Sequence, residues 1–361
     1  MEITDNFSNS DGQHYTDIFK QKNVPVFQNK TYLKKEDALG ASLGDVDLVQ
    51  SKNSGFVFNR SFDPGLMNYD INYQNEQSNS AVFQQHMQDV LSKLNGFGLH
   101  DKKVVEIGCG KGVFFEIMLK NGIDCIGFDP TYEGNNPKIV KEYFKEGNNI
   151  NADIIIMRHT LEHIPNPFSF MHTIAKANGN KGKIYVEVPT FDWILAKRAF
   201  WDIFYEHCNY FTESSLGVMF EDAKTGSFFG GQYIYLWADL AKLKHTIDPV
   251  EINNSLDLDF EAEVEKYRKL LEENPSLAIW GAGAKGSTFL NLLDPENKMV
   301  KYVIDINPLK QDRYVAHTGH PIYSPEILKT QPVESILIMN ENYMDEIIKL
   351  VGETKINFYK L

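Results

Sequence analysis

Hydrophobic residues in the first half of the chain gather in short runs with polar residues between them. Runs at residues 104–107, 123–128, 152–157 and 183–189 are rich in Val, Ile and Met. Such continuous apolar runs are typical of strands buried on both faces of a parallel sheet. A helix is expected over residues 114–119, and Gly122 marks its end. The pattern predicts an α/β domain built on a parallel sheet.

The same order of strand, turn and helix returns near the C-terminus. Residues 277–280 and 300–304 are apolar runs with a helical stretch at residues 287–293 between them. Residues 336–339 and 344–351 predict a later strand and a final helix. The charged stretch at residues 258–271 predicts a helix that links two domains. We therefore expect a second, Rossmann-like α/β domain.

The N-terminal region has a different pattern. Residues 1–54 carry no long helical period, and their best strand candidates are residues 25–27 and 46–49, followed by residues 55–59. Ser80 is placed to cap a helix whose apolar stripe follows it. We expect a small cap over residues 1–68, an α/β domain over residues 69–245 and a C-terminal α/β domain over residues 246–361.

Length and charge narrow the functional class. The chain has 361 residues and a formal net charge of −13, which fits two or three domains of about 150 residues each. No long basic run is present, which argues against nucleic acid as the main partner. No apolar run of about 18 residues exists, so we expect no membrane span. The polar N-terminus lacks a secretory signal, and the three scattered cysteines fit a reduced, cytoplasmic setting.

A glycine-rich turn follows the first apolar run. Glu106 lies in that run, and Gly108, Gly110 and Gly112 follow at alternate positions, in the order E-x-G-x-G-x-G. Glycine permits a sharp turn and the close approach of a ligand to the main chain. Asp129 ends the second run, where an acid can accept hydrogen bonds from ribose hydroxyls. The arrangement predicts a nucleoside site at the mouth of the sheet.

This spacing resembles the first motif of class I methyltransferases that use S-adenosylmethionine (SAM). The resemblance implies that the glycine turn lies under the methionyl part of SAM and that Asp129 holds its ribose. His159 and Leu161 follow the third run, at the same edge of the sheet, and Tyr73 and Ser78 precede the first helix of this domain. We expect all four beside SAM, although packing and capping would also explain Tyr73 and Ser78.

Three residues after the third run are of the types that bind metal ions. His159, Glu162 and His163 have the spacings of ligands on a helix, but they leave a strand and meet Pro165 shortly afterwards. A continuous ligand helix is therefore not expected, and we predict no metal there.

Residues 200–212, FWDIFYEHCNYFT, form a second informative stretch. Aromatic residues with a few polar groups suit a ligand pocket, and an aromatic core with a hydrogen-bonded histidine is the alternative. The stretch follows the strand at residues 183–189, on the expected ligand side of the sheet. Glu206 adjoins His207, the pair expected where a carboxylate tunes an imidazole base.

A second glycine turn lies in the C-terminal domain. Gly281, Gly283, Lys285 and Gly286 fall within a G-x-G-x-x-G motif between a strand and a helix, and Asp305 ends the next strand. This context is typical of a bound dinucleotide. A helix N-terminus would equally receive the diphosphate of a substrate. Because the first turn already supplies a SAM site, we favour the substrate.

Three stretches together resemble one family, the SAM-dependent C-methyltransferases of nucleotide-linked deoxysugars. They are FDPGLMNYDINYQNEQSNSAVFQQH, EVPTFDWILAKRAFWDIFYEHCNYFT, and IWGAGAKGSTFLNLL with VIDINPLKQDRY, within residues 45–345. The resemblance implies an N-terminal zinc-binding domain, a central SAM domain and a C-terminal Rossmann-like domain that helps to hold the nucleotide sugar. It also implies methylation of a carbon next to a ketone, with a Tyr-x-Glu-His motif supplying the base and its neighbours.

Two departures from the family pattern stand out. Residues 51–54 read Ser-Lys-Asn-Ser where a Cys-x-x-Cys pair would sit, and no cysteine precedes Cys109, so no zinc is expected. The tyrosine of the motif falls on Phe204, with Tyr205 one position later. A hydroxyl expected in the site is therefore missing or moved.

The resemblance assigns His207 as the base that removes a proton beside the ketone, with Glu206 orienting it. Tyr205, Tyr210 or Asn209 would donate to the enolate oxygen. Other functions stay open: O- or N-methylation of a small metabolite, an NAD(P)-dependent oxidoreductase, or a non-catalytic SAM-binding protein. We expect a small-molecule partner, most readily a nucleotide-linked sugar, and leave a homodimer open.

Overall fold

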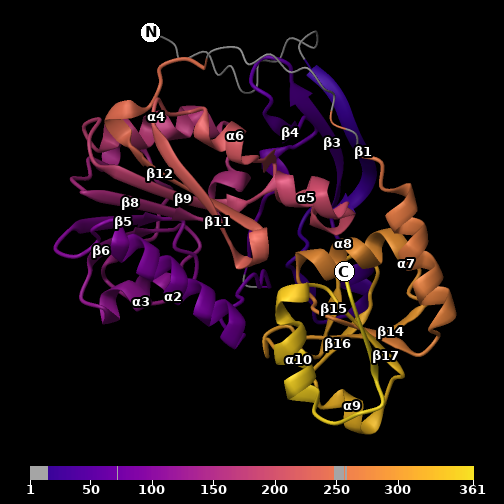
Figure 1. Ribbon diagram of the computed structural model, residues 1–361. Coiled ribbons are helices and arrows are strands. Elements are labelled where there is room, and N and C mark those ends of the chain that lie inside the picture. The colour runs from indigo at the N-terminus through magenta and orange to yellow at the C-terminus, as the bar shows by residue number, and fades with distance from the viewer. Residues whose placement is uncertain (1–14, 71, 248–255, 257) are drawn as a thin grey trace.

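A computed structural model describes residues 15–70, 72–247, 256 and 258–361 (Figure 1). Three β-sheets organise these residues. Two are seven-stranded and contain parallel strands with helices beside them, and the third is four-stranded. The class is therefore α/β, with two Rossmann-like sheets, as the hydrophobic pattern predicts.

The central sheet has the strand order β11-β12-β9-β8-β5-β6-β7. Its strands are β5 (Lys103–Ile107), β6 (Asp124–Phe128), β7 (Ile139–Val140), β8 (Ile154–Arg158), β9 (Lys183–Pro189), β11 (Ala223–Phe228) and β12 (Tyr233–Asp239). Strands β5 to β9 are parallel, whereas β12 is antiparallel to both β9 and β11. The strand order reverses at β5, and ligands of open α/β sheets bind at such switch points.

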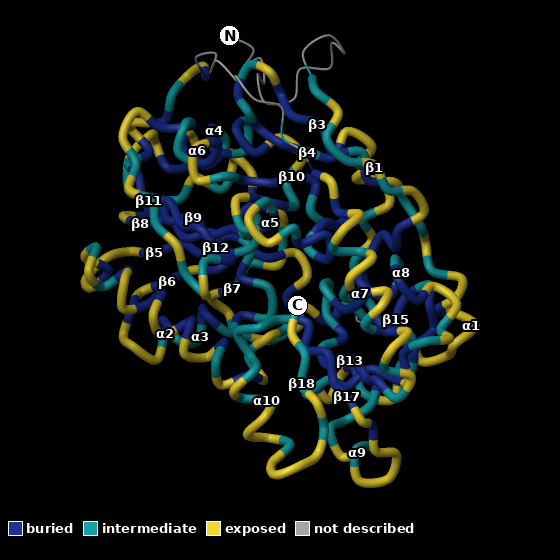
Figure 2. The backbone as a smooth tube through the Cα atoms, turned by 45° about the vertical axis from the view of Figure 1, so that its right-hand side comes forward, coloured by how far each residue is buried: buried dark blue, intermediate teal, exposed yellow. Residues whose placement is uncertain are grey.

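Helices cover both faces of the central sheet (Figure 1). The pair α2 (Ala81–Gly96) and α3 (Val113–Lys120) packs on one face, and α4 (Pro167–Ala177) packs on the other. The Ser80 hydroxyl accepts the Phe83 N–H and so caps α2, as predicted. The short helices α5 (Phe191–Lys197) and α6 (Glu213–Gly217) follow later. Figure 2 shows the strands of this sheet buried between exposed helix faces and loops.

The second seven-stranded sheet has the order β18-β17-β13-β14-β16-β15-β2. Its strands are β2 (Thr31–Tyr32), β13 (Leu277–Trp280), β14 (Val300–Ile304), β15 (Arg313–Val315), β16 (Pro321–Tyr323), β17 (Ser335–Ile338) and β18 (Asn357–Lys360). The accompanying helices are α7 (Glu261–Glu273), α8 (Ala284–Leu293), α9 (Ile327–Thr330) and α10 (Met344–Val351). The predicted final helix matches α10, whereas β18 was not predicted.

The four-stranded sheet contains β1 (Tyr15–Pro25), β3 (Leu43–Ser51), β4 (Val57–Asn59) and β10 (Asn209–Tyr210). The short helix α1 (Lys35–Leu39) lies between β2 and β3 along the chain. Two strands cross the domain limits expected from the sequence: β2 joins the C-terminal sheet, and β10 joins the N-terminal one. Short strands from one part of the chain thus pair with sheets of another part.

A serine-rich turn occupies the position where the family resemblance implies zinc cysteines. The Ser51 hydroxyl accepts the N–H groups of Asn53 and Ser54, both at 3.3 Å. The Ser54 hydroxyl accepts the Phe56 N–H at 3.4 Å. Serine hydroxyl groups therefore accept hydrogen bonds from backbone N–H groups of this turn between β3 and β4.

Candidate active site

One large cavity lies between the central sheet and the C-terminal sheet. Its volume is about 580 Å³, and both glycine turns line it. Glu106, Gly108 and Gly110 come from the first turn, and Gly281, Gly283 and Gly286 from the second. The sequence-predicted SAM and substrate turns therefore face a common space.

The first turn joins β5 to α3. Gly108 and Gly110 have φ values of +77° and +55°, in the left-handed region that favours glycine. A Cβ on Gly108 would meet the Thr160 hydroxyl at 2.1 Å, whereas a Cβ on Gly110 would meet no atom within 4 Å. The space above Gly110 is thus an open cradle at the mouth of the sheet, which fits the methionyl part of SAM.

Asp129 supports this turn from the end of β6. One carboxylate oxygen accepts the Gly110 N–H at 2.8 Å, and the other accepts the N–H and hydroxyl of Thr131 at 2.8 and 2.7 Å. The residue is 8% exposed and does not line the cavity. Its described contacts hold the turn in place, and its expected role on the SAM ribose stays a prediction.

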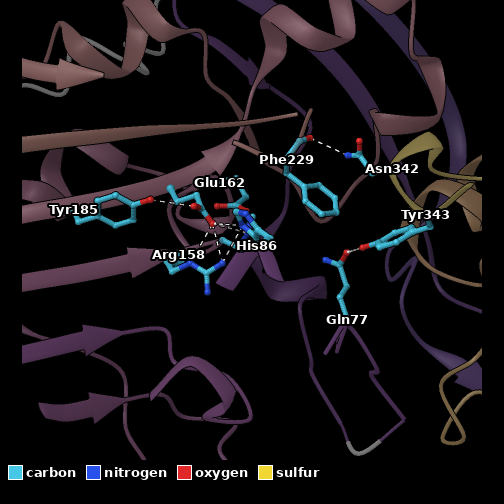
Figure 3. A network of polar contacts seen from close by, with 10 residues as sticks. Gln77, His86, Arg158, Glu162, Tyr185, Phe229, Asn342 and Tyr343 are labelled. Carbon is cyan, nitrogen blue, oxygen red and sulfur yellow. Dashed lines mark hydrogen bonds and ion pairs between the residues drawn. The ribbon is translucent and has the colours of Figure 1, made fainter. Parts of the chain in front are cut away.

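A buried polar network stands beside the first turn (Figure 3). Oε1 of Glu187 accepts two guanidinium hydrogen bonds from Arg158, at 3.1 and 2.9 Å, and lies 3.1 Å from His86 Nε2. The Tyr185 hydroxyl donates to the other oxygen at 3.0 Å. Burial would raise the pKa of Glu187, but the Arg158 charge and the hydrogen bonds with His159 and His86 hold it well below its usual range. His159 completes the network, with Nε2 3.2 Å from Glu187.

His207 faces the cavity from the stretch after α5. Its ring packs on Phe204 with the ring centres 4.2 Å apart, and on His163 at 4.9 Å. Burial, and then the neighbouring His163, His159 and Lys285, keep the pKa of His207 well below 6.5. The imidazole is therefore neutral at pH 7, the form that accepts a proton.

Glu206 points away from the imidazole that it was expected to orient. Its carboxylate accepts the backbone N–H groups of Gln28 and Asn29, at 2.6 and 3.2 Å, and the Tyr73 hydroxyl at 2.5 Å. Burial raises the pKa of Glu206 to about 7. Among the described contacts, His207 is positioned by ring packing instead.

Three of the expected donors and neighbours have other partners. The Tyr205 hydroxyl accepts the Asp63 N–H at 2.8 Å, and this residue does not line the cavity. The Tyr210 hydroxyl bonds the backbone of Phe204, and the Asn209 amide donates to the carbonyl oxygens of Leu161 and Ile164. Tyr210 and Asn209 line the cavity, but these contacts already engage their donor groups.

Some of the other predicted cofactor residues line the cavity and some do not. Tyr73 and His159 line the cavity, whereas Ser78, Gly112 and Leu161 do not. Ser78 lies between the lining residues Gln77 and Asn79. Leu161 is fully buried, which fits a packing role.

Two side chains bond the backbone of the second glycine turn. Asp305 accepts the Ala282 N–H at 2.8 Å and so braces the turn. The buried Lys310 donates to the Ala282 carbonyl at 3.1 Å. A Cβ on Gly283 would lie 3.6 Å from Asn29 Oδ1 and 3.8 Å from Lys310 Nζ. An ammonium group and an amide thus stand at the mouth of the turn.

Lys285, at the start of α8, also faces the cavity. It donates to Asp202 at 2.8 Å and to Gln232 at 3.2 Å, and its ammonium lies 4.4 Å from the centre of the Trp193 ring. These contacts tie the second turn to the central domain.

Two clusters have the residue types of a metal site. Ligand atoms of Glu162, His163 and His207 lie within 4.8 Å of one another, and so do those of His86, His159 and Glu187. Glu187 is already paired with Arg158 in the second cluster. In the first, His163 Nδ1 lies 2.8 Å from the Glu206 carbonyl oxygen. The predicted absence of a metal stays a prediction.

Several lining residues were missed as candidates from the sequence. Arg158, Lys310, Asn29 and Lys111 all face the cavity. Arg158 ends β8, so its place at a strand end was a usable signal. Asn29 gave no signal, because its place at the cavity depends on contacts with distant parts of the chain: its backbone bonds Glu206 and Gln74, and the adjacent strand β2 pairs with β15.

Comparisons with known proteins agree with this geometry. Residues 79–224 match the model of a methyltransferase domain, and residues 259–356 match a C-methyltransferase C-terminal domain. The C-methyltransferase NovU of Streptomyces niveus is 24% identical over 358 residues, covering 87% of this chain and 84% of that protein. The ubiquinone biosynthesis O-methyltransferase of Aliivibrio fischeri is 32% identical over 106 residues, covering 25% of this chain and 45% of that protein.

Two solved structures each match less than half of this chain. A SAM-dependent methyltransferase from Archaeoglobus fulgidus has a TM-score of 0.36 and 19% identity, covering 44% of this chain and 95% of that chain. One from Aquifex aeolicus has a TM-score of 0.33 and 17% identity, covering 46% of this chain and all of that chain.

The open cradle at Gly110, the α/β topology and the two matched domains lead to the same assignment. No helix in the described ranges is long and apolar enough to cross a membrane. The chain is a SAM-dependent methyltransferase, and its residues 259–356 match the C-methyltransferase C-terminal domain.

Proposed function

We propose that this enzyme methylates a carbon next to a ketone of a nucleotide-linked sugar. The observation that carries the proposal is the shared cavity, in which His207 lies with the SAM turn and the second glycine turn. A sugar and its nucleotide need such a two-part site. The printed name of the NovU relative, a C-methyltransferase, supports carbon as the methylated atom.

His207 is the proposed base. Its neutral imidazole faces the cavity and is free of any described hydrogen bond, so a ring nitrogen can take the proton beside the ketone. Bound SAM supplies the methyl group that the resulting carbanion takes. Surrounding aromatic rings limit water near the base.

Tyr73 is the proposed donor to the developing enolate oxygen. Its hydroxyl faces the cavity and donates to Glu206 Oε2 at 2.5 Å, so it would turn from this carboxylate to reach the enolate oxygen. The Tyr205 hydroxyl, expected for this task, bonds Asp63 and does not line the cavity. Donors fixed before the reaction stabilise an oxyanion more effectively than mobile water. Tyr73 would thereby supply the hydroxyl that is missing at Phe204.

The second glycine turn is proposed to receive the nucleotide diphosphate. Lys310 brings a buried amino group to the turn, and burial lowers its pKa below the usual value, against the opposing charges of Asp305 and Glu206. An anion at this helix N-terminus would also meet the positive end of the α8 dipole. Asp305 braces the turn through Ala282 N–H, which fits a role in turn structure.

A proton-exchange experiment tests the carbon mechanism. Wild-type protein with S-adenosylhomocysteine (SAH) and a nucleotide keto-sugar in deuterated water should exchange the proton next to the ketone. His207→Ala should lose this exchange while still binding SAH. Exchange that survives the substitution would remove His207 as base. Methyl transfer to a substrate without such a proton would favour O- or N-methylation, to which the partial O-methyltransferase match also points.

A further inference from the structure

Glu162 is a buried acid on the wall of the cavity. It lies in the short turn η3 (Leu161–His163), which follows β8, and it is 2% exposed. Its Oε1 atom lies 3.8 Å from His159 Nδ1, and its Oε2 atom has no hydrogen-bond partner in the described part of the chain. Figure 3 shows this side chain beside the network of Arg158 and His86. A buried carboxyl group without a partner is costly, so a ligand group that pairs with it would remove that cost.

The turn that carries Glu162 is tied to the stretch that carries His207. The Cys208 thiol donates to the Glu162 carbonyl oxygen at 3.4 Å, and His163 Nδ1 lies 2.8 Å from the Glu206 carbonyl oxygen. A carboxyl oxygen of Glu162 and a ring nitrogen of each histidine, His163 and His207, lie within 4.8 Å of one another. The acid is therefore held at a fixed place next to the proposed base.

Of these three groups, Glu162 is the one that can donate a hydrogen bond. His207 must offer a lone pair if it is to act as a base. The Glu206 carbonyl oxygen can only accept, so His163 carries its proton on Nδ1, and burial, which lowers the pKa of His163 to about 4, leaves its Nε2 an acceptor. Burial and the charge of Glu187 raise the pKa of Glu162 to about 8, so its carboxyl group keeps a proton at pH 7.

The spacing of Glu162 and His207 suits the two ends of a ketone that loses a neighbouring proton. The carbon that loses the proton and the carbonyl oxygen are two bonds apart. With hydrogen bonds of about 3 Å to each, the base nitrogen and the donor oxygen stand on the order of 4–6 Å from one another. The observed limit of 4.8 Å fits this requirement.

We propose that Glu162 is a second catalytic residue, whose protonated carboxyl group donates a hydrogen bond to the ketone oxygen while it becomes an enolate oxygen. The inference rests on the proposed carbon methylation. His207 takes the proton from the carbon, the electron pair moves to the oxygen, and Glu162 keeps its own proton. The pair returns when the carbon takes the methyl group of bound SAM. Because an enolate oxygen accepts more than one hydrogen bond, Glu162 complements Tyr73, and a carboxyl group kept neutral by burial is suited to this task.

Glu162→Met and Glu162→Gln form a matched pair of variants. Methionine keeps the length of the side chain without a donor, whereas glutamine keeps an N–H donor. The exchange of the proton next to the ketone is measured in deuterated water with SAH and a nucleotide keto-sugar. It should fall roughly 100-fold or more in Glu162→Met and stay within about tenfold of the wild type in Glu162→Gln. Calorimetry should find wild-type affinity for SAH in both variants, which shows that the fold is intact.

The possible outcomes separate this inference from the proposed function. Equal exchange in the wild type and in Glu162→Met would overturn the role of Glu162 alone. Equal losses in the two variants would also overturn it, because an ionised carboxylate, as a base or a metal ligand, would then be required. A wild type that does not exchange the proton would overturn the carbon methylation and this inference with it.

The pH profile of exchange gives a readout that does not depend on the methionine variant. The titratable groups that face Glu162 are His159, His163, Glu187, His207 and Cys208. A donor must be protonated, so the wild-type rate should fall as the pH rises through about 8, the pKa of Glu162. Glu162→Gln keeps its donor at every pH and should lack this alkaline limb. An unchanged limb in Glu162→Gln, or no limb in the wild type, would overturn the proposal.

Discussion

The Tyr73 hydroxyl donates a hydrogen bond to Glu206 Oε2 across 2.5 Å, although the two residues are 133 positions apart. The other oxygen of Glu206 accepts the backbone N–H groups of Gln28 and Asn29. One buried carboxylate therefore joins the N-terminal segment, the stretch before α2 and the stretch after α5. Because these segments meet at the cavity, this contact fixes part of its wall.

Replacement of Tyr73 by Phe tests the assignment of its hydroxyl as donor. Turnover should fall about tenfold or more, because a fixed donor to the oxyanion is lost. The SAH dissociation constant should change little. Tyr69→Phe is the matched control, since its ring packs on Tyr73 with the ring centres 4.8 Å apart. Steady-state kinetics giving the same loss in both variants would indicate a packing effect instead.

The pH dependence of turnover should reflect the lowered pKa of His207. The group is buried and faces His163, His159 and Lys285, and all three disfavour its protonation. A base must be unprotonated, so activity is lost only as pH falls through its pKa. The acid limb of the kcat profile should therefore lie well below pH 6.5. A His207-dependent limb near pH 7 or above would contradict the assignment.

The sequence specified the local units of the fold more fully than their assembly. The runs that became β5, β8 and β9 are mostly apolar and buried, which is the signal of strands buried on both faces, whereas Ile126 in β6 is 46% exposed. β11, at the edge of the sheet, has no continuous apolar run, whereas β12 is apolar and buried along most of its length and was missed although its signal was present. The two-residue strands β2 and β10 owe their place to tertiary pairing, which no local pattern predicts.

In the site, too, features set by neighbouring residues were predictable, whereas contacts between distant parts of the chain were not. The turn at Gly108 and Gly110 was predictable because a positive φ and open space both demand glycine. The adjacency of Glu206 and His207 suggested a pair, but successive residues rarely point the same way. Glu206 instead meets Tyr73 from a distant part of the chain.

The second glycine turn can be tested with Gly283→Val. A Cβ there would make ordinary contact with Asn29 and Lys310, 3.6 and 3.8 Å away, so the two methyl groups of valine would take up space at the mouth of the turn. We expect a Michaelis constant for the nucleotide sugar raised about tenfold or more, with SAH affinity intact. Gly147→Val serves as control, because a Cβ at Gly147 would meet no atom within 4 Å. Tight binding of a nicotinamide dinucleotide by the wild type would contradict the substrate role.

The serine turn between β3 and β4 should hold without zinc. Elemental analysis should find no stoichiometric zinc, because no cysteine lies before Cys109. Ser51→Ala removes the acceptor for two N–H groups and should lower the free energy of unfolding by about 0.5–1.5 kcal/mol. Denaturant titration measures the change. One tightly bound zinc per chain would refute the first expectation and direct attention to Glu162, His163 and His207.

Cofactor binding should release a proton through Glu106. Burial raises the pKa of this carboxyl to about 7; Arg158 acts against the rise and Asp129 adds to it, and Cys109 is the neighbouring thiol. The ammonium of the ligand favours the charged carboxylate, so binding lowers this pKa and expels a proton in the window just below pH 7.

Calorimetry in buffers of different ionisation enthalpy measures this proton directly. Wild-type protein should release up to about one proton per SAH near pH 6.5, and the release should fade above pH 8, where Glu106 is already ionised. Binding of 5′-methylthioadenosine, which has no ammonium, should release almost none. Glu106→Gln should abolish the release with SAH. A release that persists in this variant would assign the proton to another group and separate Glu106 from the amino-acid end of the cofactor.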